Sequence, residues 1–357
     1  MSWEKTTIGS HCTVTSSKRF HLSDRSESGI PFYCSKEIIQ KVNGQDVTEC
    51  DYIKEESYEE VKSKFGVPEC GDLLITTRGT YGVPYIYKAN DKFYFADGNL
   101  TWLKEFDDNL SVDFLYYWIL SYEGQKKIDA IAKGTAQKAV PIASIRDIEL
   151  TIPPIETQRR IASILSAYDD LIENNQKQIK LLEEAAQRLY KEWFVDLHFP
   201  GWKTAEIVDG VPVGWETTTI DQVCDTIGGG TPSTKNEAYY NDGKIKWVTP
   251  SDITKNNGLI LLDTEKKITQ AGLENSSAKM LPPYSILMTS RASIGFFGIC
   301  KDSVCTNQGF ISCVPFREET RFYLLYNLMN RLDEIRSKAT GSTFFELSKR
   351  TFRQFVI

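Results

Sequence analysis

The chain has 357 residues, of which 41% are hydrophobic and 25% charged, as is usual for a globular protein of one to three domains. Its net charge of −6 argues against a protein that binds nucleic acid by bulk positive charge. The N-terminal residues lack the apolar run of a signal peptide, and no segment approaches the roughly 20 apolar residues of a membrane span. We therefore expect a cytoplasmic protein without a membrane partner. The eight cysteines form no Cys-x-x-Cys pair and only three histidines accompany them, so we expect reduced core thiols and no metal site.

An internal repeat organises the chain. The segment Trp3–Ile8 (WEKTTI) returns as Trp215–Ile220 (WETTTI), and Thr77–Gly82 (TRGTYG) returns as Ser290–Gly295 (SRASIG). Likewise, residues 134–150 correspond to residues 341–357. The order is kept and the spacing stays at about 210 residues, which is too long for a solenoid unit and indicates a duplicated domain. Two similar domains on one chain suggest a protein that recognises two similar targets at a fixed distance from each other.

Each copy is expected to be an α+β domain of short strands and a few helices. The expected elements, in chain order, are a buried strand at 73–77, a hairpin of 85–87 with 93–95, a helix over 112–132 and a closing strand at 148–150, then a buried strand at 285–289, a helix over 320–338 and a closing strand at 355–357. The two buried strands each end in a turn that begins with an arginine, Arg78 or Arg291.

A long helix is expected between the copies, because residues 156–194 contain no glycine or proline and follow Pro153-Pro154. Alternating steps of four and three residues place an almost wholly apolar seam on it: Ile161, Leu165, Tyr168, Ile172, Asn175, Ile179, Leu182, Ala186, Leu189 and Trp193. This spacing is typical of a coiled coil, in which the single polar entry, Asn175, sets the register. We therefore expect these ten residues to pack against a partner helix, along a rod roughly 60 Å long.

The predicted organisation has four parts. They are a first recognition domain (1–153), a spacer helix (154–198), a turn-rich linker (199–214) and a second recognition domain (215–357).

Several segments of the chain resemble one known family. Ile152–Leu165 (IPPIETQRRIASIL) and Leu189–Asp196 (LYKEWFVD) resemble the two ends of the conserved helix of type I restriction–modification specificity subunits. Gly71–Gly79 (GDLLITTRG) resembles that family's strand before an Arg-Gly turn. Gly228–Ser233 (GGGTPS), followed by Ile245–Ile253 (IKWVTPSDI), resembles a further pattern of the family.

The resemblance implies a DNA-specificity subunit without catalysis of its own. Its two target-recognition domains would each read one half of a bipartite site in double-stranded DNA, and the helix would space them. The resemblance also implies that the helix docks modification subunits, which use S-adenosylmethionine, and that ATP-dependent restriction subunits join them. Cofactors, including magnesium, are therefore expected in the partners and not in this chain.

The family usually carries a second helix after the second domain, antiparallel to the first. The sequence reaches Ile357 where that helix would begin. The expectation is either a truncated sequence or a second copy or another chain that supplies the helix.

Candidate DNA contacts follow from base and phosphate chemistry, since arginine pairs with guanine while lysine, serine, threonine and glycine-rich backbone suit phosphates. The candidates lie in four places: the turns at the ends of the two buried strands, the loop that follows the three glycines, two basic segments at equivalent places in the two copies, and a serine-rich loop. In that order the candidates are Arg78, Gly79, Thr80, Arg291 and Ser293; Thr231, Ser233 and Lys235; Lys133, Gln137, Lys138, Lys338, Ser342 and Thr343; and Lys18, Arg19 and Arg25.

One rival interpretation stays open from the residues alone. The duplicated domains could form a protein-interaction scaffold without sequence-specific DNA binding. An amino-methyltransferase is disfavoured, because Leu281 stands before Pro282-Pro283-Tyr284 where that chemistry needs Asn or Asp to hold the amine. No glycine-rich cofactor loop or P-loop is present in the sequence either.

Overall fold

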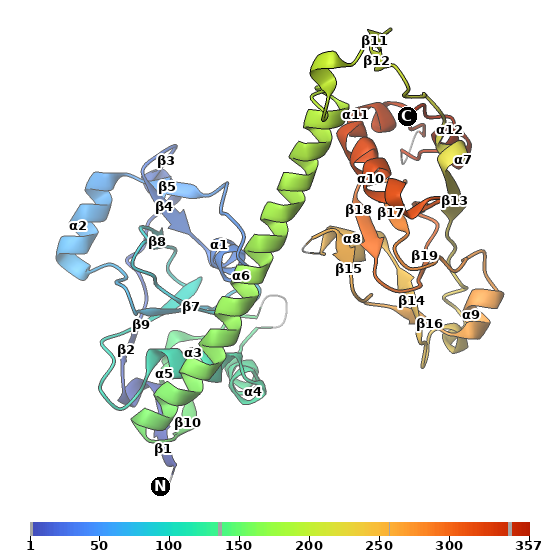
Figure 1. The fold of residues 1–357 in the computed structure, drawn as a ribbon. Coiled ribbons are helices and arrows are strands. Elements are labelled where there is room, and N and C mark those ends of the chain that lie inside the picture. The colour runs from blue at the N-terminus through green and yellow to red at the C-terminus, as the bar shows by residue number, and fades with distance from the viewer. Residues whose placement is uncertain (1–2, 135–137, 257, 342–344) are drawn as a thin grey trace. The chain divides into compact units, whose positions relative to one another are not determined.

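The computed structural model describes residues 3–134, 138–256, 258–341 and 345–357. The chain divides into two compact units, residues 1–174 and 175–357, and each is described by itself (Figure 1). Both units mix mostly antiparallel strands with helices, so the α+β prediction is confirmed.

The first unit contains two four-stranded sheets, with strand orders β2-β9-β6-β7 and β3-β5-β4-β8, and a separate β1-β10 pair. Its strands are β1 (Glu4–Thr7), β2 (Thr13–Thr15), β3 (Arg25–Ser26), β4 (Ile30–Tyr33), β5 (Asp51–Ile53), β6 (Leu73–Thr76), β7 (Pro84–Ile86), β8 (Tyr94–Phe95), β9 (Leu100–Lys104) and β10 (Glu149–Ile152). Its short helices are α1 (Ser35–Val42), α2 (Glu55–Phe65), α3 (Val112–Leu120), α4 (Tyr122–Ile131) and α5 (Ile142–Arg146).

The second unit repeats this plan with sheets ordered β13-β20-β17-β18-β15 and β16-β14-β19 and a small β11-β12 hairpin. Its strands are β11 (Ile207–Val208), β12 (Val211–Pro212), β13 (Cys224–Gly228), β14 (Ile245–Val248), β15 (Ile260–Leu261), β16 (Lys267–Ile268), β17 (Ile286–Thr289), β18 (Phe297–Cys300), β19 (Cys305–Thr306) and β20 (Phe310–Pro315). Its short helices are α7 (Ile220–Val223), α8 (Pro250–Thr254), α9 (Gln270–Glu274), α10 (Arg321–Asn330), α11 (Leu332–Ser337) and α12 (Lys349–Arg353).

The buried strands predicted from apolar runs are the central strands of the two larger cores. In the first unit Leu73 and Ile75 of β6 pack with Leu115 and Ile119 of α3. In the second unit β17 and α10 form the equivalent core, through residues such as Ile286 and Leu324. The duplication predicted from the sequence is therefore also a duplication of core packing.

The predicted hairpin of residues 85–87 and 93–95 is wrong. Strand β7 pairs with β6, whereas β8 pairs in parallel with β4 in the other sheet. The chain turns between them, where the Asp91 N–H donates to the Lys88 carbonyl at 3.0 Å. The Tyr87 and Phe93 rings then pack 4.8 Å apart in a shared core, so tertiary packing sends the two strands to different sheets.

The two helices predicted over 112–132 and 320–338 are each broken in two. Ser121 ends α3 and caps α4, because its hydroxyl accepts the Gly124 N–H at 3.1 Å. Arg331 separates α10 from α11 in the second copy. A serine hydroxyl at a cap accepts a hydrogen bond from the backbone, which favours ending one helix and starting another. The spacing of apolar residues does not reveal this break.

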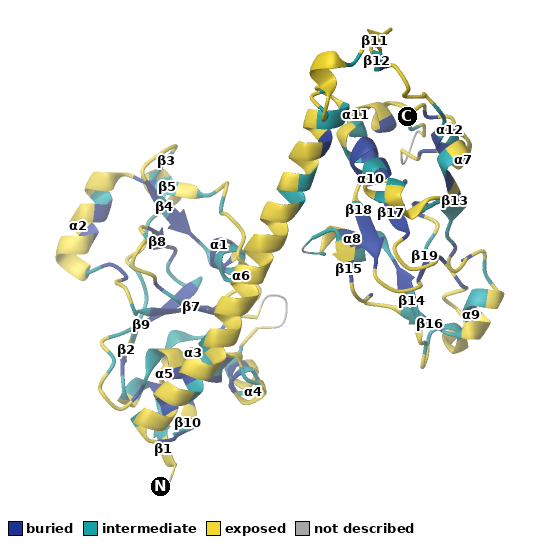
Figure 2. Cartoon of the chain, viewed as in Figure 1, coloured by how far each residue is buried: buried dark blue, intermediate teal, exposed yellow. Residues whose placement is uncertain are grey.

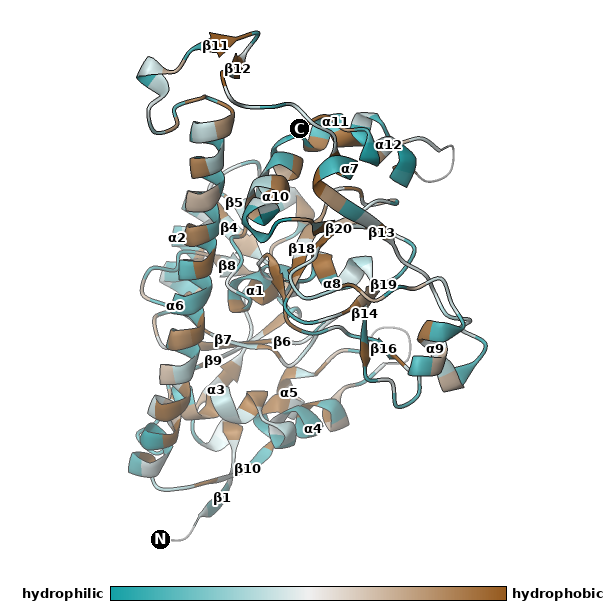
Figure 3. Ribbon diagram, turned by 45° about the vertical axis from the view of Figure 1, so that its right-hand side comes forward, coloured by the Kyte–Doolittle hydropathy of each residue, from teal (hydrophilic) through white to brown (hydrophobic). Residues whose placement is uncertain are grey.

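The predicted spacer is a single helix, α6 (Ile155–Phe194), of 40 residues. Most of its residues are exposed (Figure 2), and hydrophobic residues recur along the helix (Figure 3). Of the ten seam residues, Ile161, Ala186 and Trp193 are half-buried, whereas Leu165, Tyr168, Ile172, Asn175, Ile179, Leu182 and Leu189 are exposed. Within the described residues, no helix is both long and apolar enough to cross a membrane.

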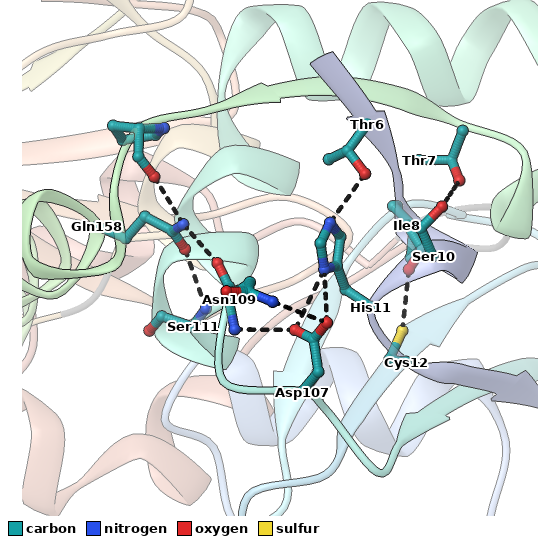
Figure 4. A network of polar contacts seen from close by, with 11 residues as sticks. Thr6, Thr7, Ile8, Ser10, His11, Cys12, Asp107, Asn109, Ser111 and Gln158 are labelled. Atoms are coloured by element: carbon teal, nitrogen blue, oxygen red, sulfur yellow. Dashed lines mark hydrogen bonds and ion pairs between the residues drawn. The ribbon is translucent and has the colours of Figure 1, made fainter. Parts of the chain in front are cut away.

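A buried glutamine fastens the start of α6 to the first unit (Figure 4). The Gln158 side chain is fully buried, and its amide donates to the Asn109 carbonyl at 2.8 Å and to the Pro153 carbonyl at 2.9 Å. Its side-chain carbonyl accepts the Ser111 N–H at 3.0 Å. The neighbouring Asp107 carboxylate binds His11 and Asn109, and although burial opposes this, those hydrogen bonds hold the pKa of Asp107 below its usual range.

Aromatic side chains fasten the other end of α6 to the second unit. The Tyr190 ring is buried, 5.9 Å from the Tyr323 ring and 6.2 Å from the Tyr326 ring, and Phe194 lies 4.8 Å from Tyr323. Burial raises the pKa of Tyr190 to about 12, so the phenol stays neutral among these rings. The Glu183 carboxylate also accepts the Leu259 N–H at 2.8 Å.

We expect Gln158→Leu to destabilise the first unit by about 2–3 kcal/mol, because it leaves the half-buried Ser111 N–H and the Asn109 and Pro153 carbonyls without these partners. Chemical denaturation and hydrogen exchange of residues 155–166 would measure the loss. Thr157→Ala, at the exposed neighbouring position, is the control and should change stability by less than about 0.5 kcal/mol. Equal stability of the two variants would contradict the anchoring role.

Candidate nucleic-acid interface

The turns that follow β6 and β17 have the same hydrogen bonds. The Thr76 hydroxyl donates to the Thr80 carbonyl at 2.8 Å and accepts the Val83 N–H at 3.0 Å. The Thr289 hydroxyl likewise donates to the Ser293 carbonyl and accepts the Phe296 N–H at 2.9 Å. These bonds hold Arg78 and Arg291 at equivalent exposed positions.

A loop from the end of each copy closes against this turn. Lys133 and Ala139 exchange two backbone hydrogen bonds of 2.9 Å, and the Val140 N–H donates to the Thr77 carbonyl at 2.9 Å. In the second unit Thr340 and Glu346 exchange bonds of 3.0 and 2.9 Å, and the Leu347 N–H donates to the Ser290 carbonyl at 2.9 Å. Lys133 and Lys138 are thereby brought beside Arg78. The candidates Gln137, Ser342 and Thr343 lie outside the described residues.

A third segment joins the same place in both copies. The Arg19 guanidinium bonds the Asp97 carboxylate at 2.8 Å, and a Cβ placed on the adjacent Gly98 would lie 3.8 Å from the Arg78 guanidinium. In the second unit the Thr231 hydroxyl bonds the Gln308 side chain, and the adjacent Gly309 carbonyl accepts the Ser290 N–H at 2.8 Å. Three segments distant in sequence therefore meet at the end of the central strand in each unit.

The remaining candidates are placed apart from this group or have other partners. Lys18 lies over the Phe65 ring, with its Nζ 4.7 Å from the centroid. Arg25 is half-buried, forms an ion pair with Asp51 and stacks on Phe32, which fits a structural role. Ser233 and Lys235 are exposed on the loop before Asn236, and Lys338 is exposed at the end of α11.

The glycine run before Thr231 is tightly packed. A Cβ on Gly230 would lie 2.3 Å from the Ser277 Oγ and 2.4 Å from the Ala278 nitrogen. The Gly230 carbonyl also accepts the Trp247 indole N–H at 3.0 Å. These contacts hold Thr231 at a defined position, so the flexible loop that a glycine run ordinarily suggests is not what these residues form.

The two strand-end arginines differ in their electrostatic surroundings. Arg291 Nε lies 3.8 Å from a Glu346 carboxylate oxygen, whereas the place of Glu346 in the first unit is taken by Ala139. Sequence reasoning overlooked Glu346, Asp97 and Gln308. The alignment of the two copies could have revealed Glu346, because it lies within the third repeated segment opposite Ala139, but the pairing of Asp97 with Arg19 requires the fold.

The thiols of the two cores are structural. The Cys12 and Cys224 thiols each donate to the carbonyl four residues earlier, at 3.4 Å. Burial raises the pKa of Cys12 to about 12 and that of Cys305 to about 12, which keeps both thiols protonated. Within the described ranges, no group of His, Cys, Asp and Glu could hold a metal ion.

Comparison with known proteins identifies the class to which this chain belongs. The family described as "Type I restriction modification DNA specificity domain" matches residues 1–184 and 212–357. The chain therefore belongs to this family and contains two regions that match it, so the alternative of a duplicated interaction scaffold is not favoured.

Named relatives agree with this assignment. The chain is 33% identical over 149 residues to the type I restriction enzyme MjaIX specificity subunit of Methanocaldococcus jannaschii, covering 41% of this chain and 34% of that one. It is 23% identical over 352 residues to the HindI specificity subunit of Haemophilus influenzae, covering 80% of this chain and 76% of that one. The crystal structure of a type I restriction–modification S subunit from M. genitalium has the same fold, with a TM-score of 0.58, 17% identity, and coverage of 100% of this chain and 84% of that one.

The strand-end turns predict a difference in stability between the copies. Gly79 has φ +70°, and its counterpart Ala292 has φ +59°, a left-handed conformation that costs a residue with a Cβ about 1–2 kcal/mol. We expect Ala292→Gly to stabilise the second unit by about 0.5–1 kcal/mol, and Gly79→Ala to destabilise the first by about 1 kcal/mol. Hydrogen exchange of the amides of Ile286–Thr289 and Leu73–Thr76 measures each unit separately. A loss of protection in Ala292→Gly would refute the prediction.

Proposed function

We propose that this chain is a non-catalytic specificity subunit in which each unit reads one half of a bipartite site in double-stranded DNA. The observation that carries the proposal is the repeated convergence of three segments at the strand ends marked by Arg78 and Arg291. Side chains that suit base edges and phosphates gather there in both copies, on backbones fixed by the same hydrogen bonds.

The proposed contacts differ in kind within each unit. The guanidinium of Arg78 can bind guanine edges or phosphate through two parallel N–H donors. Lys133 and Lys138 flank it as point charges for the phosphates, and Thr80 and Ser293 add hydroxyls on the same turns. Arg19 and Thr231 occupy the third segment of each group, where acceptor groups of DNA would compete with Asp97 for Arg19 and with Gln308 for Thr231.

The exposed seam of α6 supports the proposed partners. Leucine, isoleucine and tyrosine side chains along it stay accessible in this chain, and such a stripe is normally buried against another helix. We propose that modification subunits dock on this helix, together with a helix from a second copy or another chain, and that restriction subunits join this assembly. The S-adenosylmethionine, magnesium and ATP chemistry would then belong to those partners.

We expect Arg78→Ala and Arg291→Ala each to weaken specific DNA binding by roughly 10- to 100-fold, the loss of one bidentate contact. The measurement is a titration of the assembled complex with a site found by selection from random DNA. Arg25→Ala is the control, because Arg25 is paired within the first unit and should leave specificity unchanged. If neither strand-end variant alters binding, or if selection enriches no sequence, the proposal fails.

We expect Leu165→Glu or Ile179→Glu to prevent assembly with modification subunits, because a carboxylate on the seam would have to be desolvated in the interface. Light scattering of the mixed subunits would report the mass of the complex. Arg188→Glu places the same charge on the opposite face of α6 and should assemble normally. An unchanged mass for both seam variants would show that partners dock elsewhere.

A further inference from the structure

The loops beside the two strand-end arginines carry different kinds of side chain at one equivalent exposed position, among other differences. Each loop is closed by the same pair of backbone bonds, Lys133 with Ala139 and Thr340 with Glu346. The residue just before the second member of each pair is Lys138 in the first unit and Phe345 in the second. A flexible cation and an aromatic ring thus occupy the same place on equivalent surfaces.

The Phe345 ring is presented to solvent from a fixed backbone. Its side chain is 63% exposed. Its carbonyl accepts the Ala292 N–H at 2.9 Å, and the next residue, Glu346, is bonded twice to Thr340. A single exposed apolar residue is common on a protein surface. This one is set beside Arg291, in the group of segments that the proposed function assigns to DNA.

The surroundings of Phe345 favour base contact over phosphate contact. Glu346 lies next to it and partly neutralises Arg291, so this point of the surface has little net charge to attract a phosphate. Exposed cations nearby in sequence, Lys338, Lys349 and Arg350, can serve the phosphates instead. The apolar group that DNA offers in its major groove is the C5-methyl of thymine.

We propose, building on the function above, that Phe345 reads a thymine by packing against its C5-methyl group, whereas Lys138 binds a phosphate at the equivalent place. The two units then recognise their half-sites through different side chains, which stand on the same backbone arrangement. Phe345 is a specificity-determining residue for the half-site of the second unit.

The test replaces each thymine of the selected site, one at a time, with uracil, which lacks only the methyl group. Binding of the assembled complex is measured for the unaltered chain and for Phe345→Ala. At one thymine of one half-site, uracil should weaken binding of the unaltered chain about three- to tenfold, and Phe345→Ala should weaken binding of the thymine site by a similar factor. In Phe345→Ala the uracil substitution at that position should have no further effect.

Two variants serve as controls. Phe316→Ala removes a ring of similar exposure, 57%, from the far end of β20 and should not change binding. Lys138→Ala should weaken binding more at low than at high salt and should leave every thymine-to-uracil effect intact. Additive effects of Phe345→Ala and uracil at every position, or no effect of Phe345→Ala, would overturn the inference. The proposed function would still stand in that case if Arg78→Ala and Arg291→Ala weaken specific DNA binding as expected above.

Discussion

One backbone hydrogen bond in each unit underlies the candidate interface. The Val140 N–H donates to the Thr77 carbonyl, and the Leu347 N–H donates to the Ser290 carbonyl, both at 2.9 Å. Each bond attaches a loop to the end of a central strand that lies some sixty residues earlier in the sequence. Together with the bridges Arg78–Ala139 and Arg291–Glu346, it gives the strand-end arginine and the loop side chains a fixed relation. A base edge can be read only by groups held at a set distance from one another.

Because these bonds involve main-chain atoms, side chains around them are free to differ. The turn threonines, Thr76 and Thr289, keep the same two bonds in both copies, while the loop positions carry Lys138 in one unit and Phe345 in the other. A duplicated domain can therefore keep its architecture and change what it recognises. The ion pair of Arg291 with Glu346, which has no counterpart at Ala139, is another such difference.

The ends of the spacer helix α6 are held by buried contacts, whereas its middle is exposed. Its ends are held by a fully satisfied buried amide at Gln158 and by the stacked aromatic rings around Tyr190. Between them, apolar side chains such as Ile172 and Leu182 are more than half exposed. Exposed leucine and isoleucine contribute little to the stability of a helix by itself, so the middle of α6 has the character of an interface.

The sequence by itself determined the duplication, the long helix and the central strands, because these depend on local periodicity and on direct comparison of one segment with another. It also identified Arg78 and Arg291 as equivalent residues. It predicted a hairpin where β7 and β8 enter different sheets, and it joined α3 to α4, because strand partners and a capping serine depend on contacts that periodicity does not encode. Only the tertiary structure brought Arg19 to Asp97, fixed the glycine run before Thr231 and set Phe345 beside Arg291. These arrangements join residues from distant segments, and the physical reason is that hydrogen bonds and close packing act over a few ångströms in space, whatever the separation along the chain.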